Sequence, residues 1–508
     1  MKLIHLFLIF CSPCICLSPV FAGSPLDSSI SSPDWLLTAM EEISAERMLA
    51  DIRILSGPAL AGRQTGTRED ERSASFVTNR FSELRLHRAA AGPAQRLTNP
   101  LPQQEWKQTA SVPIRRIGDD VLIELVRPHE RRSLVTGTHF LPVLDSPSAD
   151  VRSPIVFVGY GIADPSRGID DYAGVDVRNK IVLFLRGKPD RYAAAVAQAD
   201  KERVAKEKGA VGYLLATGPI LTAYEQRRGV TGAPSAFYSK TASTTQLPGA
   251  WISTETAEWI LQQGATGITT LRAIQEELNR TGLSKPVVTD VTAQMRWTSS
   301  RETGTLFNVM SLIRGHTVNS DETVLVGAHR DHFGRQAGLL FAGADDNASG
   351  TAVLLEIARV LSLAPAAPKR SILFVSFSGE EQGFLGSRLY VAQPIVPLLK
   401  TIGMINVDHA GTGNGRLTVG VTGLEKSTAD GIGQLTGLSD KLDVFGFFPG
   451  GDHVPFTKAD IPTVTVVSGG VHPHFHQPGD TVDTINPDIL QSVARYVLAL
   501  TWQLANQP

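Results

Sequence analysis

One stretch of the chain, residues 371–387, joins a strand-like apolar run to a pair of acidic residues. Its first half is almost wholly apolar or β-branched, which is typical of a strand buried on both faces of a parallel sheet. A Ser-Gly pair ends the run, and Glu380 and Glu381 follow at once. Ligands of open α/β sheets gather beyond the carboxyl ends of the strands, so the pattern predicts two carboxylates at a functional edge. An isolated acidic pair is more often a solvated loop, and the rest of the chain decides between these interpretations.

Strands and helices alternate in the C-terminal half of the chain. We expect strands over 324–328, 372–377, 404–407 and 463–467, and helices over 351–361 and 489–504. This order predicts an α/β fold, with a mostly parallel mixed sheet covered by helices on both faces. Residues 35–86 are expected to be helical, with a Gly-rich turn at 55–67 that carries no catalytic group of its own.

The N-terminus predicts export from the cytoplasm. Lys2 precedes an apolar run that is too short for a comfortable membrane span, and Ala22 ends a plausible cleavage site. All three cysteines lie within this segment, so the mature chain is expected to lack disulfides, thiolate nucleophiles and Cys-ligated zinc. We therefore predict a secreted or periplasmic protein with a signal peptide over 1–22; an uncleaved signal anchor is the alternative.

Composition and motif searches exclude several classes of function. With 42% hydrophobic residues, 19% charged residues and a net charge of −2, the chain has a globular composition and no basic field for nucleic acid. Beyond the N-terminal segment no run is apolar enough to span a membrane. The sequence lacks the H-E-x-x-H, G-x-S-x-G and Walker motifs. Partners and activity must therefore be argued from local sites.

Residues of the metal-binding type follow several of the expected strands. Histidine and carboxylate ligands without sulfur suit zinc, and to a lesser degree manganese or cobalt. Taken singly, such residues have simpler explanations, because Asp346 could only cap a helix and Asp408 could only stabilise a turn. Their joint placement predicts a metal centre. The candidates are His329, Asp331, Asp345, Asp346, Glu380, Glu381, Asp408, His472, His474, His476 and Asp480.

In these motifs the chain resembles the secreted co-catalytic zinc aminopeptidases, whose family includes glutamate carboxypeptidases and glutaminyl cyclases. The resemblance covers most of residues 44–486. It implies two zinc ions per chain, one held by His329 and Asp408 and the other by Glu381 and His476. Asp346, which opens the sequence D-N-x-S-G, resembles the carboxylate that bridges both metals.

The resemblance also implies a mechanism and a substrate class. A hydroxide between the zinc ions would attack the peptide, while Glu380 as general base takes the water proton and passes it to the leaving amine. Asp331 is expected to orient His329, and Asp480 to do similar work near His476, with a role as a cap or turn residue as the alternative for Asp480. The implied substrates are peptides with a free N-terminus; we expect no nucleic acid and no membrane partner after signal cleavage.

An inserted segment carries its own resemblance. Its motifs VFVGYGI and DDYAGVDVRNKIVL are similar to the protease-associated domain found within several of these enzymes. We expect residues 23–133 to form the N-terminal part of the peptidase domain, 134–275 this small β-rich insertion, and 276–508 the di-zinc peptidase domain. The insertion is interpreted as a lid over the active site, or alternatively as a module that only covers part of the peptidase surface.

Three departures from the family pattern concern substrate preference more than metal binding. Arg330 stands where an aromatic residue is expected, Gly451 where serine is usual, and His409-Ala410 where Met-Val is commoner. One alternative function is a carboxypeptidase for acidic C-terminal residues, with Arg330 and Arg335 as the candidate cations; a cyclase with the same zinc site is another. A further alternative is an inactive, receptor-like binding protein on the same fold.

Overall fold

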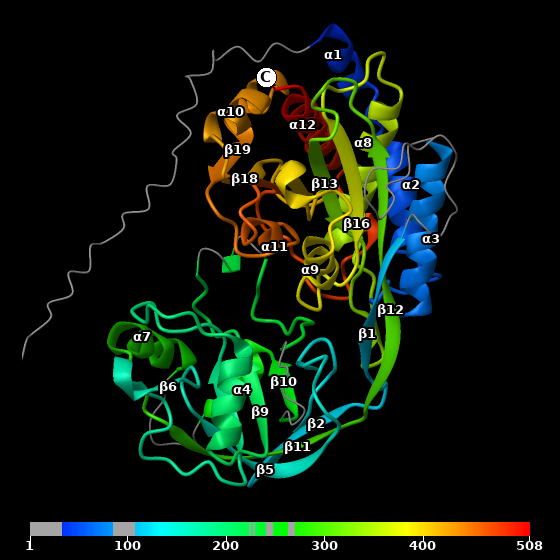
Figure 1. Ribbon diagram of the computed structural model, residues 1–508. Coiled ribbons are helices and arrows are strands. Elements are labelled where there is room, and N and C mark those ends of the chain that lie inside the picture. Colours follow the sequence, from blue (N-terminus) through cyan, green and yellow to red (C-terminus); the bar gives the residue numbers. More distant parts are fainter. Residues whose placement is uncertain are drawn as a thin grey trace, which may run out of the picture.

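The computed structural model describes residues 33–84, 107–222, 225–226, 229–239, 247–262 and 270–507. The predicted signal peptide and all three cysteines lie outside these ranges. Two eight-stranded sheets organise two bodies, with the N-terminal and C-terminal helices gathered on the larger one (Figure 1). None of the described helices is both long and apolar enough to cross a membrane.

The first sheet has the order β1-β12-β16-β13-β17-β20-β18-β19. Its strands β16, β13, β17 and β20 are mutually parallel, whereas β12 and β18 pair antiparallel on either side of them. The predicted mostly parallel mixed sheet is therefore confirmed. The strands are β1 (Lys107–Ile117), β12 (Ser299–Ile313), β13 (Thr323–His329), β16 (Ser371–Phe377), β17 (Thr401–Val407), β18 (Leu417–Thr422), β19 (Leu442–Phe445) and β20 (Thr463–Ser468).

Helices cover both faces of this sheet, as predicted. Alternate residues of a strand point to opposite faces, so Val324 and Val326 join one apolar core and Leu325 joins the other. Helices α1, α2, α3, α8, α10 and α12 pack on the first face, and α9 and α11 on the second. Their bounds are α1 (Asp34–Glu41), α2 (Ala45–Leu55), α3 (Arg68–Glu83), α8 (Gly350–Ser362), α9 (Leu385–Ala392), α10 (Lys426–Leu435), α11 (His453–Thr457) and α12 (Pro487–Asn506).

The second sheet belongs to the insertion and has the order β3-β2-β11-β5-β8-β9-β10-β4. The insertion is β-rich, as predicted, and its sheet also recruits strands outside the expected range 134–275. The chain division at 134 and 275 stays a prediction. The elements are β2 (Leu122–Arg127), β3 (Glu130–Ser133), β4 (Phe140–Pro142), β5 (Ala149–Phe157), β8 (Ile181–Leu185), α4 (Gln198–Glu207), β9 (Gly212–Ala216), β10 (Gly249–Ile252), α6 (Thr254–Leu261), α7 (Leu271–Thr281) and β11 (Val287–Trp297), with short hairpin strands β6 (Ala163–Asp164) and β7 (Ile169–Asp170).

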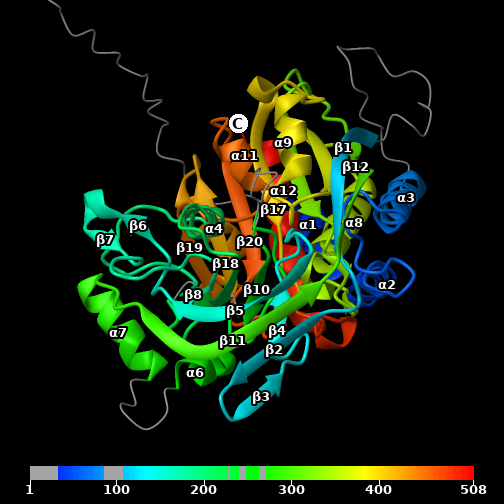
Figure 2. The same cartoon turned by 90° about the horizontal axis from the view of Figure 1, so that it is seen from below.

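A two-stranded ribbon connects the two sheets. Strands β1 and β12 pair antiparallel from Lys107 opposite Val309 to Ile117 opposite Ser299. The same two passages of the chain continue as β2 and β11, which pair antiparallel in the second sheet. Both crossings between the bodies therefore lie side by side (Figures 1 and 2).

Candidate metal and catalytic site

Most of the candidate site is delivered by the carboxyl ends of the parallel strands. His329 is the last residue of β13, Glu380 and Glu381 follow β16, and Asp408 follows β17. Because these strands are neighbours with the same direction, their ends meet at one edge of the sheet. Two loops complete the arrangement: residues 343–349 ahead of α8 carry Asp346, and the loop after β20 carries His476.

The five residues expected to bind metal come together in this structure. His329 Nε2 lies 3.3 Å from Asp346 Oδ1 and 3.3 Å from Asp408 Oδ1. His476 Nε2 lies 3.1 Å from Asp346 Oδ2 and 3.5 Å from Glu381 Oε2. The two oxygens of Asp346 thus face two different histidines, each with a further carboxylate. That these side chains bind zinc stays a prediction.

The electrostatics of the group fit a bound cation. Burial and the nearby carboxylates of Asp346 and Glu380 raise the pKa of Glu381 well above its usual value. Asp408 Oδ1 is buried and faces the His329 and His409 rings, at 3.3 Å and 3.9 Å, without a well-oriented hydrogen bond to any described residue. Burial would raise the pKa of Asp346 as well, but the His409 and His329 rings bring it well below its usual value. A divalent cation would balance these crowded carboxylates, and the nitrogen and oxygen donors suit zinc.

Asp331 joins the two strand ends that carry His329 and Glu380. His329 Nδ1 lies 3.2 Å from the backbone oxygen of Asp331 and 3.7 Å from its carboxylate. That carboxylate accepts hydrogen bonds from the backbone N–H of Glu380 at 3.2 Å and the hydroxyl of Thr65 at 2.9 Å. The predicted orienting role of Asp331 is thus compatible with the geometry, with its backbone oxygen as the nearer partner of the ring.

The Gly-rich turn at 55–67 supports the site, although it supplies no group that touches the five candidates directly. The fully buried guanidinium of Arg63 donates to the carbonyl oxygens of Leu55 and Arg330, to that of Ala342 at 2.9 Å and to that of Gly343 at 2.7 Å. Arg63 therefore ties α2 to the loops beside His329 and Asp346. An arginine within a glycine-rich turn was the only sequence signal for this role.

His332 was missed by the sequence analysis. It lies three residues after His329 in the same motif, and its Nδ1 is 2.8 Å from Glu381 Oε1. Burial lowers its pKa well below the usual value. His332 therefore holds one oxygen of Glu381 while the other faces His476.

The expectation for Asp480 was wrong. Its carboxylate accepts the backbone N–H groups of Asp345 at 2.7 Å and Asp346 at 3.0 Å, so it fixes the loop that carries Asp346. The Nδ1 atom of His476 instead lies 3.0 Å from the backbone oxygen of Ala236, in the inserted domain.

A second polar cluster adjoins the site. His472 Nδ1 lies 2.6 Å from Asp345 Oδ2, and Thr412 donates to the same oxygen at 2.8 Å. His409 lies between the clusters, with Nδ1 3.3 Å from Asp345 Oδ2 and Nε2 3.4 Å from Asp346 Oδ2. Asp345 and His472, which were candidates for metal binding, are thus hydrogen-bonded to each other, whereas His474 belongs to neither cluster among the described contacts.

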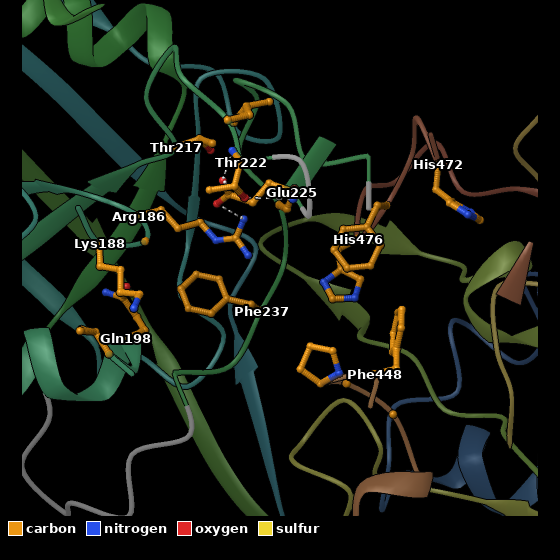
Figure 3. Close-up of a pocket in the computed structure, with 18 of the residues that line it drawn as sticks. Arg186, Lys188, Gln198, Thr217, Thr222, Glu225, Phe237, Phe448, His472 and His476 are labelled. Atoms are coloured by element: carbon orange, nitrogen blue, oxygen red, sulfur yellow. Dashed lines mark hydrogen bonds and ion pairs between the residues drawn. The ribbon is translucent and has the colours of Figure 1, made fainter. Parts of the chain in front are cut away.

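The site opens into a cavity of about 1070 Å³ between the two bodies. Asp346, Glu380, Glu381 and Asp408 line it from the larger body, and residues of the insertion line it from the other. In Figure 3, Arg186 and Phe237 of the insertion lie across from His476 and Phe448. The cavity residues of the insertion include Tyr160, Arg186, Lys188, Thr217, Phe237 and Trp251.

The cations expected for a carboxypeptidase do not line this cavity. Arg330 is fully buried, with Nη2 2.8 Å from Asp70 Oδ1 in the core of the larger body. Arg335 is exposed on the short strand β14 (Gly334–Gln336), which pairs with β15 (Leu339–Phe341). An aromatic residue was expected at position 330, and the buried pair explains how arginine is accommodated there. The interpretation of Arg330 and Arg335 as substrate-binding cations is therefore wrong.

Residues 448–452, which precede α11, lie beside the cavity. Phe448, Pro449, Gly450 and Gly451 line the cavity, whereas Asp452 is fully buried and accepts the Ser387 hydroxyl at 2.6 Å. Burial and the nearby Glu380 raise the pKa of Asp452 well above its usual value.

Two segments of the chain match known protein families. Residues 308–501 match peptidase family M28, and residues 151–260 match the PA domain. Aminopeptidase YwaD of Bacillus subtilis is 30% identical over 211 residues, which are 39% of this chain and 44% of that protein. A probable glutamate carboxypeptidase of Zea mays, VP8, is 28% identical over 502 residues, which are 90% of this chain and 66% of that protein. The chain thus spans less than two thirds of the length of these two relatives.

A solved structure shares the fold. An aminopeptidase from Aneurinibacillus sp. strain AM-1 superposes with a TM-score of 0.64 at 22% sequence identity. The match covers 93% of this chain and 97% of that one, so both bodies are included in the similarity.

Proposed function

We propose that the chain is a secreted zinc aminopeptidase of peptidase family M28, because residues 308–501 match that family and residues 151–260 match the PA domain. The observation that carries the proposal is the pair of histidines that face the two oxygens of Asp346. We assign His329 and Asp408 to one zinc ion, Glu381 and His476 to a second, and Asp346 to both. When bound, zinc polarises a carbonyl oxygen and lowers the pKa of a water molecule to about 7.

Glu380 is the proposed general base. It lines the cavity next to Asp346 and Asp408, and its backbone N–H is held by Asp331. Its carboxylate takes a proton from the attacking water as the new C–O bond forms. It returns that proton to the leaving nitrogen as the C–N bond breaks, so the products are a free amino acid and a shortened peptide.

The inserted domain limits which substrates reach the site. Pockets for small ligands are commonly about 300–1,000 Å³, so the volume of this cavity is suited to the end of a peptide rather than to a folded protein. Aromatic side chains line it from both bodies, including Phe237, Trp251, Phe447 and Phe448. We therefore propose that large apolar N-terminal residues are accepted and that the insertion acts as a lid.

A matched set of substrates tests the proposal. Purified protein is incubated with a peptide, with its N-acetylated form and with amino-acyl chromogenic substrates. Cleavage of the free peptide alone, lost with a chelator and restored by added zinc, is the expected result. The absence of metal-dependent release of any residue would sink the proposal and favour an inactive binding protein.

A carboxypeptidase is the second candidate, because the Zea mays relative over most of the chain is named as one. The cavity contains Arg186 and Lys188, which could face an acidic C-terminal residue in place of Arg330 and Arg335. Removal of a C-terminal residue from the N-acetylated peptide would select this function. Formation of pyroglutamate from an N-terminal glutamine peptide would select a cyclase.

Secretion is proposed from residues 1–22 alone. Expression of the full chain with its own N-terminus, followed by N-terminal sequencing of the exported protein, is expected to give a mature chain that begins after Ala22. An intact N-terminus on membrane-associated protein would indicate a signal anchor instead.

A further inference from the structure

We propose that the inserted domain positions His476 for zinc binding, through the backbone of residues 229–239. The inference rests on the proposed zinc site and adds that one of its ligands is held in place by a different domain. It gives the insertion a role inside the metal centre, besides that of covering the cavity.

A reciprocal pair of hydrogen bonds links His476 to Ala236. The backbone N–H of Ala236 donates to the backbone oxygen of His476 at 2.9 Å, and His476 Nδ1 lies 3.0 Å from the backbone oxygen of Ala236. A carbonyl oxygen can only accept, so Nδ1 must carry the proton. Nε2 is then free to present its lone pair toward Asp346 and Glu381, at 3.1 Å and 3.5 Å. Metal-binding histidines commonly donate their other ring N–H to a carbonyl in this way.

The segment 229–239 is fixed to the body of the insertion on its other side. The backbone oxygen of Phe237 accepts from Leu144 N–H at 3.0 Å, and its ring packs edge-on against Trp251. Ser239 donates its backbone N–H to Asp145 at 2.7 Å. The position of Ala236 is therefore set by the fold of the inserted domain.

The contact with the His476 loop leaves no room for an extra carbon atom. Gly229 has a left-handed φ of +67°, and a Cβ there would lie 2.0 Å from the carbonyl oxygen of His472. In the same loop, the His476 ring packs edge-on against the Phe333 ring at 4.7 Å between centroids. The Phe333 ring belongs to an apolar cluster drawn from both bodies. The cluster consists of Leu141, Leu144, Ala236, Tyr238, Phe333 and Phe341.

The histidines of the two proposed zinc sites have Nδ1 partners from different parts of the chain. His329 finds the partner for its Nδ1 in Asp331, two residues further along the peptidase chain. His476 finds its partner 240 residues away, in the insertion. Displacing the segment 229–239 is therefore expected to lower the affinity of the zinc site at His476 and to leave the affinity of the site at His329 unchanged.

Two glycine substitutions test the proposal. Gly229→Ala introduces the clash with His472, whereas Gly174→Ala, in the same domain, introduces the same left-handed strain at a φ of +74° with open space around its Cβ. Zinc affinity is measured by competition of the metal-loaded proteins with a chromophoric chelator. In Gly229→Ala, one of two zinc ions is expected to bind about 10- to 100-fold more weakly. Gly174→Ala is expected to match the wild type, and a folded Gly229→Ala with both affinities unchanged would overturn the proposal.

A second measurement needs no variant. In zinc-loaded protein with ¹⁵N-labelled histidine, the signals of His476, assigned with His476→Gln, are expected to show a protonated Nδ1. A protonated Nε2 would overturn the proposal even if Gly229→Ala fails to fold. Because both readouts follow zinc and ring protonation rather than turnover, wild-type protein that binds zinc but cleaves no peptide would refute the peptidase while leaving this inference intact.

Discussion

Replacing Arg330 with methionine removes the cation that faces Asp70 inside the peptidase core. Both side chains are fully buried, and Arg330 also donates to the backbone oxygen of Phe307 at 2.7 Å and to the Ser73 hydroxyl at 3.1 Å. Removing one partner of a buried ion pair typically costs about 3–5 kcal/mol, because the other charge is left uncompensated. Asp70 would keep hydrogen bonds from Ser378, at 2.9 Å, and from the Gly66 N–H, at 3.1 Å. We therefore expect a loss nearer to about 3 kcal/mol.

The loss should depend on pH. Burial raises the pKa of Asp70 to about 6 even with Arg330 in place, and loss of the cation raises it further. Between its unfolded pKa near 4 and the raised folded value, the folded variant binds more protons than the unfolded chain, so stability falls as pH rises. The difference in unfolding free energy between wild type and Arg330→Met is accordingly expected to be smaller at pH 5 than at pH 8.

Urea unfolding followed by tryptophan fluorescence measures this difference at both pH values. Arg335→Met is the matched control, because Arg335 is exposed and its loss should change stability by no more than about 0.5 kcal/mol. Equal stability of the two variants would refute the reasoning. So would an unchanged stability of Arg330→Met combined with a raised KM for peptides with acidic C-terminal residues, because that result would place Arg330 at the substrate.

Three further predictions concern single side chains. Glu380→Gln should keep the zinc content of the wild type, measured by mass spectrometry of the metal, while kcat falls by about 10²–10⁴-fold; loss of zinc would mean that the roles of Glu380 and Glu381 are exchanged. Asp331→Asn keeps the backbone oxygen that lies 3.2 Å from His329 Nδ1, so zinc affinity in chelator competition should fall by less than about 10-fold, and a larger loss would show that the carboxylate is the partner that supports the site. Burial lowers the pKa of Lys201 to about 7 from its usual 10.5. Between these two pH values the unfolded chain binds more protons than the folded chain, so stability rises with pH. In urea unfolding, the stability of the wild type relative to Lys201→Met should therefore be greater at pH 9.5 than at pH 7. The same stability difference at both pH values would contradict the burial argument.

The central strands could be predicted because their burial is recorded in their composition. Every residue of β13, β16 and β20 is buried, and such strands appear in a sequence as near-continuous apolar runs. Strands β11 and β12 were missed, since β11 buries mainly alternate residues and the first half of β12 is largely exposed. A long antiparallel ribbon of this kind gives a weak periodic signal.

The candidate site could also be predicted only in part from the sequence. Its acids and histidines could be picked out because they follow recognisable strands in short motifs. The groups that hold them were not visible, for two physical reasons. Ala236 acts through a backbone oxygen, which every residue possesses, and Arg63 contacts loops more than 260 residues away in the sequence. Asp480 was assigned to its neighbour His476, whereas the folded chain brings it to the Asp346 loop.

The ribbon between the two bodies offers a route to excise the insertion cleanly. Ile117 lies opposite Ser299, and the Gly118 N–H donates to the backbone oxygen of Thr298 at 2.9 Å, so the two ends of the excised segment are already adjacent. A two-residue type I′ turn such as Asn-Gly closes an antiparallel pair of this kind. Substituting that turn for the intervening residues would convert β1 and β12 into a single hairpin at the border of the first sheet. The shortened chain would show how much of the proposed peptidase chemistry the α/β body can perform unaided.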